Sequence, residues 1–182
     1  MNNVSLMDWL LWYFGSCLSG TPTGMIVNFY GETNAKQTLV NFMKTIFGDY
    51  YAPLPIKLLT KCKNSLDKST HKPLSGIRLT SIDFGSEEKK LDTTALLNII
   101  TASFSPIILS DLKIPVSVIS TGGKLPFCFV PFYKTKHDDN FFVNALTTEA
   151  PAILSKLIYY SHKYIQNDYK LPQCNEIEIV KV

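Results

Sequence analysis

Residues 28–51, NFYGETNAKQTLVNFMKTIFGDYY, have the layout of a phosphate-binding loop. An apolar run leads to Gly31, a short polar stretch follows, and a helix-like run begins near Lys36. Such a loop surrounds phosphate oxygens with backbone N–H groups and a helix N-terminus, while a Lys adds charge and a Ser or Thr hydroxyl binds Mg²⁺. The chemistry that this segment indicates is therefore nucleotide binding.

The segment departs from the full pattern G-x-x-x-x-G-K-[ST] in several places. Four residues, not five, separate Gly31 from Lys36. Ala35 stands where the second glycine belongs, and Gln37 stands where the hydroxyl belongs, with Thr38 one place later. By motif alone, a strand, a turn and a helix with a solvated lysine explain the segment better.

A second candidate group ends the next predicted strand, residues 77–83. Asp83 is placed where an acid could hold Mg²⁺ and polarise a water molecule. Phe84 occupies the adjacent position instead of a second acid. Glu87 and Glu88 follow, but a solvated loop or helix start explains them better.

The elements that must position these groups are predicted by hydrophobic periodicity. A helix opens with a capping box at Ser5–Asp8, and residues 31–35 form a loop before a helix over 36–47 that Gly48 ends. Their order predicts a single α/β domain with helices around a mainly parallel sheet, in which strands 25–30, 77–83 and 115–121 lie side by side. The other predicted elements are strands 106–109 and 127–133, helices 92–102 and 150–167, and a C-terminal strand in EIEIVKV.

Composition limits the class of protein. The chain has 182 residues, of which 46% are hydrophobic and 18% charged, so it has the composition of one globular domain. A net charge of +3 permits a nucleic-acid partner without arguing for one. The four cysteines and three histidines are dispersed without metal-ligand spacing, which favours reduced thiols in an intracellular protein.

The apolar N-terminal stretch LLWYFGSCLSG has two interpretations. It could be the apolar part of a signal peptide, but no Lys or Arg precedes it and Asp8 sits at its start. A capped amphipathic helix is the preferred interpretation. No uninterrupted apolar run reaches about 20 residues, so no membrane span is predicted.

The order of segments resembles the ATPase core of viral and phage superfamily 3 helicases, the poxvirus-type primase–helicase group. In that family a helix of the type LL..lG..LtG precedes a strand ending in Tyr-Gly, an Asn-Gly-Lys-Ser-Thr loop, and a helix ending in Gly-Asp-Tyr. Asn34, Lys36 and Thr38 match the loop, and residues 48–50 match the helix end. The segments PLSGIRLTSID, SPIILSDLKIPVSVISTGGKLPF, VPFYKT and EAPAILSKLIYYSHKYIQND are similar to later parts of the family core, in order.

This resemblance implies a three-layer P-loop, AAA+-like domain with a lead-in over residues 1–24, a core over 25–135 and a C-terminal segment over 136–182. It implies ATP and Mg²⁺ as ligands, a homo-oligomeric ring, single-stranded DNA as a partner, no membrane, and an intracellular location at a viral replication site or in host cytoplasm or nucleus. The implied nucleotide-binding residues are Gly31, Asn34, Lys36, Gln37 and Thr38; the metal-binding residues are Thr38 and Asp83; the catalytic residues are Asp83 and Thr121; and the DNA-binding residue is Lys113.

The same comparison predicts impaired hydrolysis. The family places an arginine finger shortly before its IPF stretch, but here GGKLPFCFVPF contains only Lys124 as a cation. The single arginine of the chain, Arg78, begins another strand, and Gly122 follows Thr121 where a sensor amide is expected. The expected function is a superfamily 3 helicase-like nucleotide-binding domain of a viral or mobile-element replication protein. The alternatives are a functional helicase subunit with unorthodox residues, a non-enzymatic oligomerising or DNA-binding relic, and an interaction protein that reuses the fold.

Overall fold

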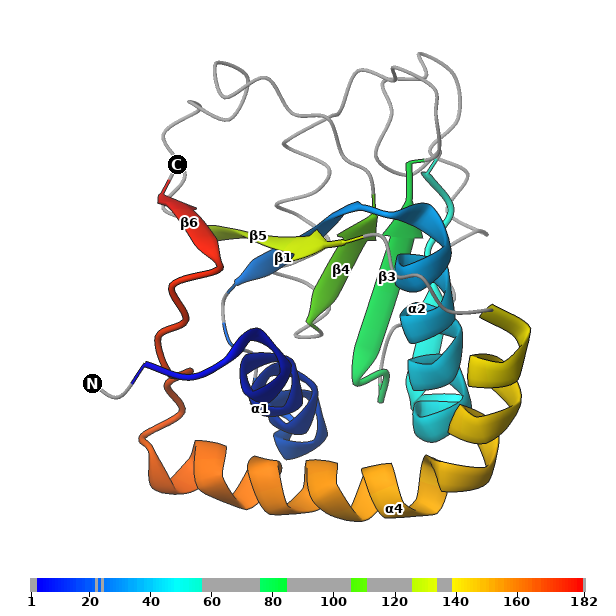
Figure 1. Ribbon diagram of the computed structural model, residues 1–182. Helices are drawn as coiled ribbons and strands as arrows, with labels where there is room; N and C mark the ends of the chain where they lie inside the picture. Colours follow the sequence, from blue (N-terminus) through cyan, green and yellow to red (C-terminus); the bar gives the residue numbers. More distant parts are fainter. Residues whose placement is uncertain are drawn as a thin grey trace, which may run out of the picture.

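The computed structural model describes residues 3–21, 23, 25–56, 76–84, 106–110, 126–133 and 139–181 (Figure 1). It is a mixed α/β fold, as the sequence predicts. In chain order the elements are α1 (Leu6–Ser19), β1 (Ile26–Gly31), α2 (Thr33–Phe47), a 3-10 turn η1 (Gly48–Tyr50), β2 (Tyr51–Pro53), β3 (Leu79–Asp83), β4 (Ile107–Ser110), β5 (Pro126–Phe132), α4 (Asp139–Gln166) and β6 (Glu178–Lys181).

The strands form one six-stranded sheet in the order β2-β3-β4-β1-β5-β6. The first five are mutually parallel, and β6 runs antiparallel to β5 at one edge. The predicted placement of strands 25–30 and 77–83 in one sheet is confirmed, with a single strand between them. That strand is β4, which corresponds to the predicted strand 106–109; residues 115–121 lie outside the described residues.

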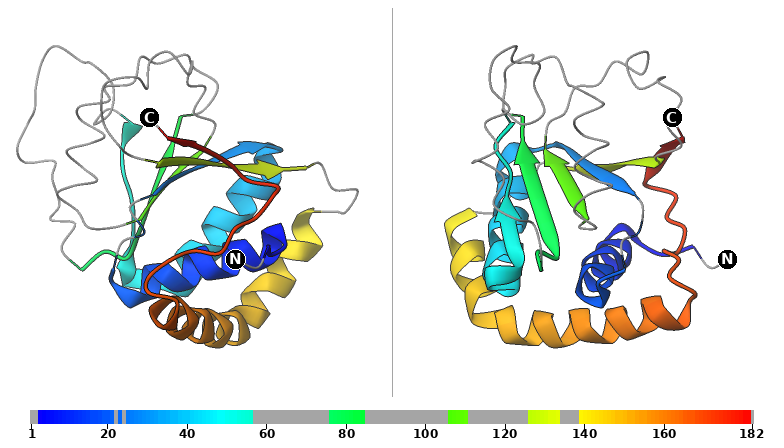
Figure 2. Two further views of the ribbon diagram at one scale, coloured as in Figure 1. Left: turned by 90° about the vertical axis from the view of Figure 1, so that its left-hand side faces the viewer. Right: turned by 180° about the vertical axis from the view of Figure 1, so that it is seen from behind.

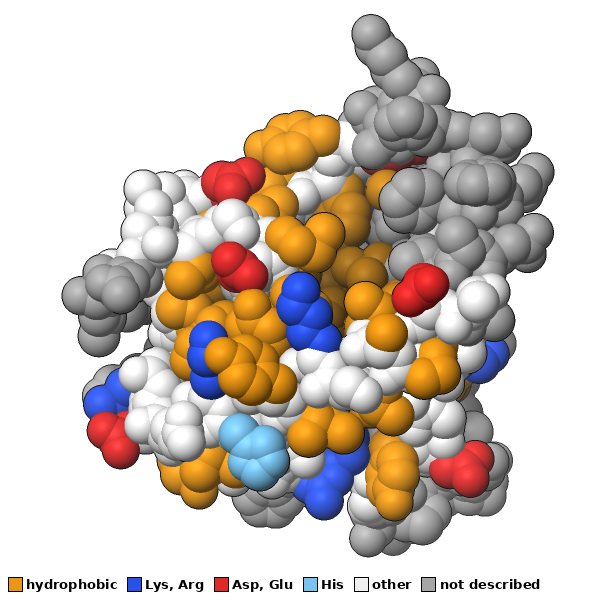
Figure 3. Space-filling view, turned by 60° about the horizontal axis from the view of Figure 1, so that its bottom comes forward, with side chains coloured by type: hydrophobic (Ala, Val, Ile, Leu, Met, Phe, Trp, Pro, Cys, Tyr) orange, Lys and Arg blue, Asp and Glu red, His pale blue; other side chains and the backbone are white. Residues whose placement is uncertain are grey.

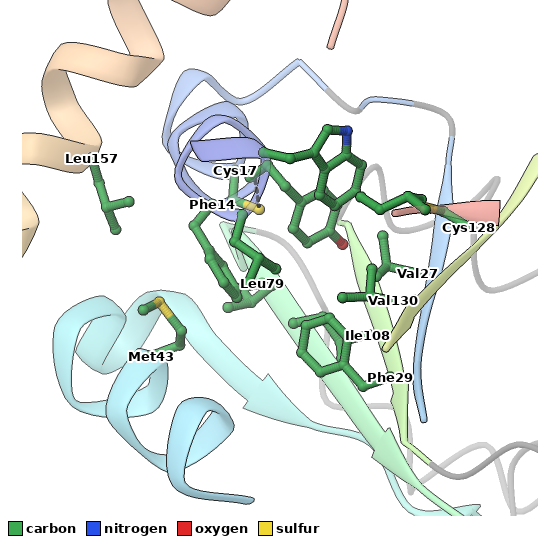
Figure 4. Packing of buried hydrophobic residues seen from close by; sticks show 14 of the residues in the cluster. Phe14, Cys17, Val27, Phe29, Met43, Leu79, Ile108, Cys128, Val130 and Leu157 are labelled. Atoms are coloured by element: carbon green, nitrogen blue, oxygen red, sulfur yellow. Dashed lines mark hydrogen bonds between the residues drawn. The ribbon is translucent and has the colours of Figure 1, made fainter. Parts of the chain in front are cut away.

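Helices α1, α2 and α4 all lie on one face of the sheet (Figures 1 and 2). Alternate strand residues, such as Val27 and Phe29 of β1, point into the core that these helices cover (Figure 4). Residues of the opposite face, such as Ile82 and Leu109, are buried as well. Burial on both faces is the pattern of a parallel sheet in a three-layer α/β fold.

The start of α1 confirms the predicted cap. The Asp8 N–H donates to Ser5 Oγ at 3.2 Å, so the hydroxyl satisfies one of the unpaired first-turn donors. The Glu176 carboxylate accepts from the Leu6 N–H at 3.2 Å, and Val4 N–H donates to the Gln173 carbonyl at 2.9 Å. These bonds join the two end segments of the chain.

Helix α4 is longer than predicted, because it begins at Asp139 instead of residue 150 and continues through Pro151. It changes direction along its course (Figure 1), and proline is the usual cause of a bend inside a helix.

Pro131 was predicted to mark an edge or an end of a strand. Pro131 lies near the end of β5, beyond Phe129, which is the last residue of β5 that pairs with β6. The N–H that proline lacks is therefore not needed for a hydrogen bond to β6.

Among the described helices, none is long and apolar enough to cross a lipid bilayer.

Helix α1 packs closely against α4 at Gly15. A Cβ at this position would lie 2.8 Å from Tyr160 Cβ and 2.9 Å from the Ser161 backbone nitrogen. The contact is continued by the Tyr160 hydroxyl, which donates to Asp8 Oδ1 at 2.8 Å, and by the edge of Trp12 against the Tyr160 ring. The absence of a side chain at Gly15 therefore sets the distance between the two helices.

We expect Gly15→Ala to lower the free energy of unfolding by about 1–3 kcal/mol, because the added methyl group meets backbone that cannot rotate away. Chemical denaturation followed by circular dichroism measures this change. Met7→Ala, at an exposed position of the same helix, is the control and should change the free energy by less than about 0.5 kcal/mol. Equal stability of the Gly15→Ala protein and the wild type would contradict the close packing.

Candidate nucleotide site at the carboxyl edge of the sheet

Strand β1 lies where the strand order of the sheet reverses. The chain leaves β1 through α2 and reaches β2 at one edge, whereas β5 pairs with β1 on its other side. In open α/β sheets, ligands bind outside the carboxyl ends of the strands at such a switch point. The groups that follow β1, β3 and β4 are therefore the candidates for a site.

Asp83 and Ser110 end neighbouring strands and are register partners, and Ser110 is also paired with Phe29. Paired residues of parallel strands point to the same face, and Phe29 faces the helices. The side chains of Asp83 and Ser110 therefore lie in one row at the carboxyl edge, on the α2 side of the sheet. Asp83 is exposed and Ser110 is half-buried.

Lys36 is the charged residue that α2 brings to this part of the molecule. Its side chain is 1% exposed and lies on the same side of α2 as Leu39, Val40 and Met43, which pack in the core. Lys36 therefore points toward the sheet from the second turn of α2, near the carboxyl end of β1. Lys36 and Asp83 were predicted to lie at the same end of the sheet and to face one cleft. They lie at the same end, and the shared cleft stays a prediction.

The predicted loop over residues 31–35 is wrong. Helix α2 begins at Thr33, and the Lys36 N–H already donates to the Glu32 carbonyl at 3.3 Å. Only Glu32 separates the last residue of β1 from the helix. Gly31 makes this sharp turn possible, because its φ is 101° and the Phe132 carbonyl oxygen occupies the place that a Cβ would need.

The early helix start changes how a phosphate could be held. Between β1 and α2 there is no loop whose backbone N–H groups could surround a phosphate, so the donors that this connection offers are the first-turn N–H groups of α2. Glu32 is the N-cap residue, and its carboxylate makes no capping hydrogen bond. A carboxylate at a helix N-terminus competes for the same positive potential that would attract a phosphate.

The other predicted nucleotide residues are not brought together with Lys36. Asn34 and Gln37 are exposed, and Thr38 is half-buried. Residues two apart on a helix do not face each other, so the Thr38 hydroxyl lies on a different side of α2 from Lys36. Asp83 fits a metal site as an exposed carboxylate beside a hydroxyl, whereas the placement of Thr38 does not fit the second metal ligand.

Ser110 is a candidate that sequence reasoning missed. The sensor position was assigned to Thr121, but the strand that lies between β1 and β3 is β4, and Ser110 is its last residue. The available signal was a hydroxyl residue directly after the buried run Ile107–Leu109. Thr121, Lys113 and Lys124 lie outside the described residues.

Arg78 is at the opposite end of the sheet from Asp83. It immediately precedes β3, and its backbone N–H donates to the Tyr50 carbonyl at 2.8 Å. Its guanidinium packs against Gly20, the left-handed C-cap of α1, where no side chain would fit. Arg78 therefore lies away from the candidate site of its own chain, and the expectation that it is a poor substitute for an arginine finger stays a prediction.

Thiol and metal chemistry find no support in the described part of the chain. Cys17, Cys128 and Cys174 are buried free thiols. Burial raises the pKa of Cys17, and it raises the pKa of Cys128 to about 12, so both thiols are protonated and inert near neutral pH. Within the described ranges, no three His, Cys, Asp or Glu residues are grouped to hold a metal ion.

No protein-family model matches this chain, and no curated protein sequence matches it.

We expect Gly31→Ala to lower the free energy of unfolding by about 3 kcal/mol or more, because positive φ and overlap with the Phe132 carbonyl both act there. Thermal and urea unfolding of the purified variant measure the change. Gly48→Ala is the matched control, since Gly48 also has a positive φ, 51°, but no atom lies near the added Cβ; it should cost less, because only the backbone strain acts there. Equal losses in the two variants would contradict the structural role of Gly31.

Proposed function

We propose that this chain is a superfamily 3 helicase-like nucleotide-binding domain of a viral or mobile-element replication protein, with impaired ATP hydrolysis. The observation that carries the proposal is the placement of Lys36, Asp83 and Ser110 at one end of the sheet. All three lie at its carboxyl edge on the α2 side, with Ser110 on β4 next to the switch-point strand β1 and Asp83 on β3, one strand further away. A cation, a carboxylate and a hydroxyl in this position are the groups that a bound Mg²⁺–nucleotide requires.

Each residue would have a distinct part in binding. The Lys36 ammonium would contact the β- or γ-phosphate as a point charge, and the first-turn N–H groups of α2 would contact an adjacent phosphate oxygen. Asp83 would hold Mg²⁺, which neutralises phosphate charge, and Ser110 would orient a water molecule beside it. In these roles the three residues only bind the nucleotide and its metal ion and position a water molecule.

Three features support slow turnover. The short turn at Gly31 leaves no phosphate loop between β1 and α2, and Glu32 places a negative charge at the helix start. Arg78 packs at the far end of the sheet. An arginine that stabilises the transferring phosphoryl group contributes about 10³–10⁵ in rate in enzymes that have one. We therefore favour a nucleotide-binding domain over the alternative of an efficient helicase subunit.

We expect Lys36→Met to weaken ATP binding at least about tenfold while the protein stays folded, because Met keeps the volume of the buried side chain and removes its charge. Isothermal titration with ATP, with and without Mg²⁺, measures the affinity, and a phosphate-release assay measures turnover. Asp83→Asn should reduce the affinity only when Mg²⁺ is present.

The matched control is Lys44→Met, which removes an exposed lysine from the last turn of the same helix. It should leave ATP affinity unchanged. Unchanged affinity in the folded Lys36→Met protein would refute the site, and rapid turnover by the wild type would refute impaired hydrolysis.

One observation favours the second candidate, a non-enzymatic oligomerising protein. The outer side of α4 exposes Ile158, Tyr159 and Ile165, and the Lys163 ammonium lies 4.6 Å from the centre of the Tyr159 ring. Hydrophobic side chains gather over the side of the molecule that carries α4 (Figure 3). Apolar side chains that cluster at the surface mark interaction sites more often than scattered ones do.

If this candidate is correct, the wild-type protein should elute as an oligomer, and Ile158→Glu should shift it to the monomer without changing its thermal midpoint. The physical reason is that a carboxylate in an apolar contact loses its hydration without gaining a partner. Light scattering coupled to gel filtration gives the mass. Lys170→Glu, at an exposed position beyond the end of α4, is the control; a monomeric wild-type protein would remove this candidate.

A further inference from the structure

Two exposed tyrosines lie side by side at the carboxyl ends of β1 and β5. Tyr30 of β1 is 44% exposed and Tyr133, directly after β5, is 68% exposed. In the register of the two strands Tyr30 is paired with Pro131, so Tyr133 follows two residues beyond the partner of Tyr30. The Glu32 N–H donates to the Phe132 carbonyl at 2.9 Å, which continues the parallel ladder to the end of β5.

Both side chains belong to the face of the sheet opposite to α2. Phe29 and Phe132 point into the helix-covered face and contact each other with ring centres 4.9 Å apart. Because side chains alternate along a strand, Tyr30 and Tyr133 point the other way. In the described part of the chain, neither of their rings stacks on another aromatic ring.

The spacing suits a planar group between the two rings. Two residues placed diagonally on neighbouring extended strands have their Cα atoms about 8 Å apart. A flat aromatic ligand in van der Waals contact with a ring on each side needs about 7–8 Å between those rings. Leaving large apolar surfaces exposed to water is unfavourable, and a nucleobase that covers the two rings would remove this surface from water, because each base offers a flat face that stacks on tyrosine.

The pair also lies close to the start of α2. Tyr30 precedes Thr33, the first residue of α2, by three residues, a chain length of at most about 10 Å. We propose that Tyr30 and Tyr133 clamp the base of a nucleotide whose phosphates lie at the start of α2. This inference rests on the proposed nucleotide site and adds the part of the ligand that the site recognises.

The protein groups around the two tyrosines indicate whether the occupant is a mononucleotide or a nucleic-acid strand. A strand in such a clamp would be held by several stacked bases and a basic groove. In the described part of this edge, one pair of rings lies near one helix start and one buried lysine, Lys36, which suits one base and its own phosphates.

The test compares three ligands with the full chain by isothermal titration: ATP with Mg²⁺, tripolyphosphate with Mg²⁺, and a short oligothymidylate. Tyr133→Ala should weaken ATP binding about tenfold or more, the range expected for one lost stacking partner, and leave tripolyphosphate binding unchanged. Tyr133→Phe keeps the ring and should bind ATP like the wild type. Tyr50→Ala removes a tyrosine that is 58% exposed at the amino end of the sheet, just before β2, and should also bind like the wild type.

Each result decides one proposal. Equal ATP affinity of wild type and Tyr133→Ala would overturn the clamp and leave the nucleotide site standing. An equal loss of ATP and tripolyphosphate affinity would also overturn it, because the base would not be involved. Binding of oligothymidylate in place of ATP, lost in Tyr133→Ala, would replace the mononucleotide by a nucleic-acid strand. Absence of both ATP and tripolyphosphate binding by the wild type would overturn the nucleotide site and the clamp together.

Discussion

The passage of the chain from β1 into α2 at Gly31 determines what the carboxyl edge of this sheet can hold. A positive φ and the neighbouring Phe132 carbonyl leave room only for a residue without a side chain. The helix begins two residues later, at Thr33, so no loop stands between strand and ligand. An anion at this edge would lie at the N-terminus of α2. The Glu32 carboxylate would oppose its binding, and the Lys36 ammonium would favour it.

The burial of Lys36 links this edge to the core. Removing an ammonium group from water is costly unless it is paired, and Lys36 does take part in an interaction. Its place on the core-facing side of α2 would suit a leucine as well, if packing were the only requirement. A buried charge at the switch point of an α/β sheet is therefore a better indication of function than the degraded motif around it.

The elements that could be predicted from the sequence are those with signals close by in the chain. Apolar runs gave β1, β3 and β4, and the Ser5 cap gave the start of α1, because those signals lie within a few residues of the element. The start of α2 was missed because the turn at Gly31 depends on Phe132, a residue about a hundred positions away. Ser110 was missed for a similar reason: strand order, which puts it beside Asp83, arises from pairing between distant segments.

The position of the single arginine sets a limit on what the edge can catalyse. The guanidinium of Arg78 packs at the C-terminus of α1, where the helix end carries partial negative charge and the Gly20 C-cap leaves room for it. A lysine could replace an arginine finger only as a point charge without the bidentate fork. A factor of 10³–10⁵ in rate corresponds to about 4–7 kcal/mol of barrier. Within one chain, the described residues therefore give more support to the proposed nucleotide binding than to rapid turnover.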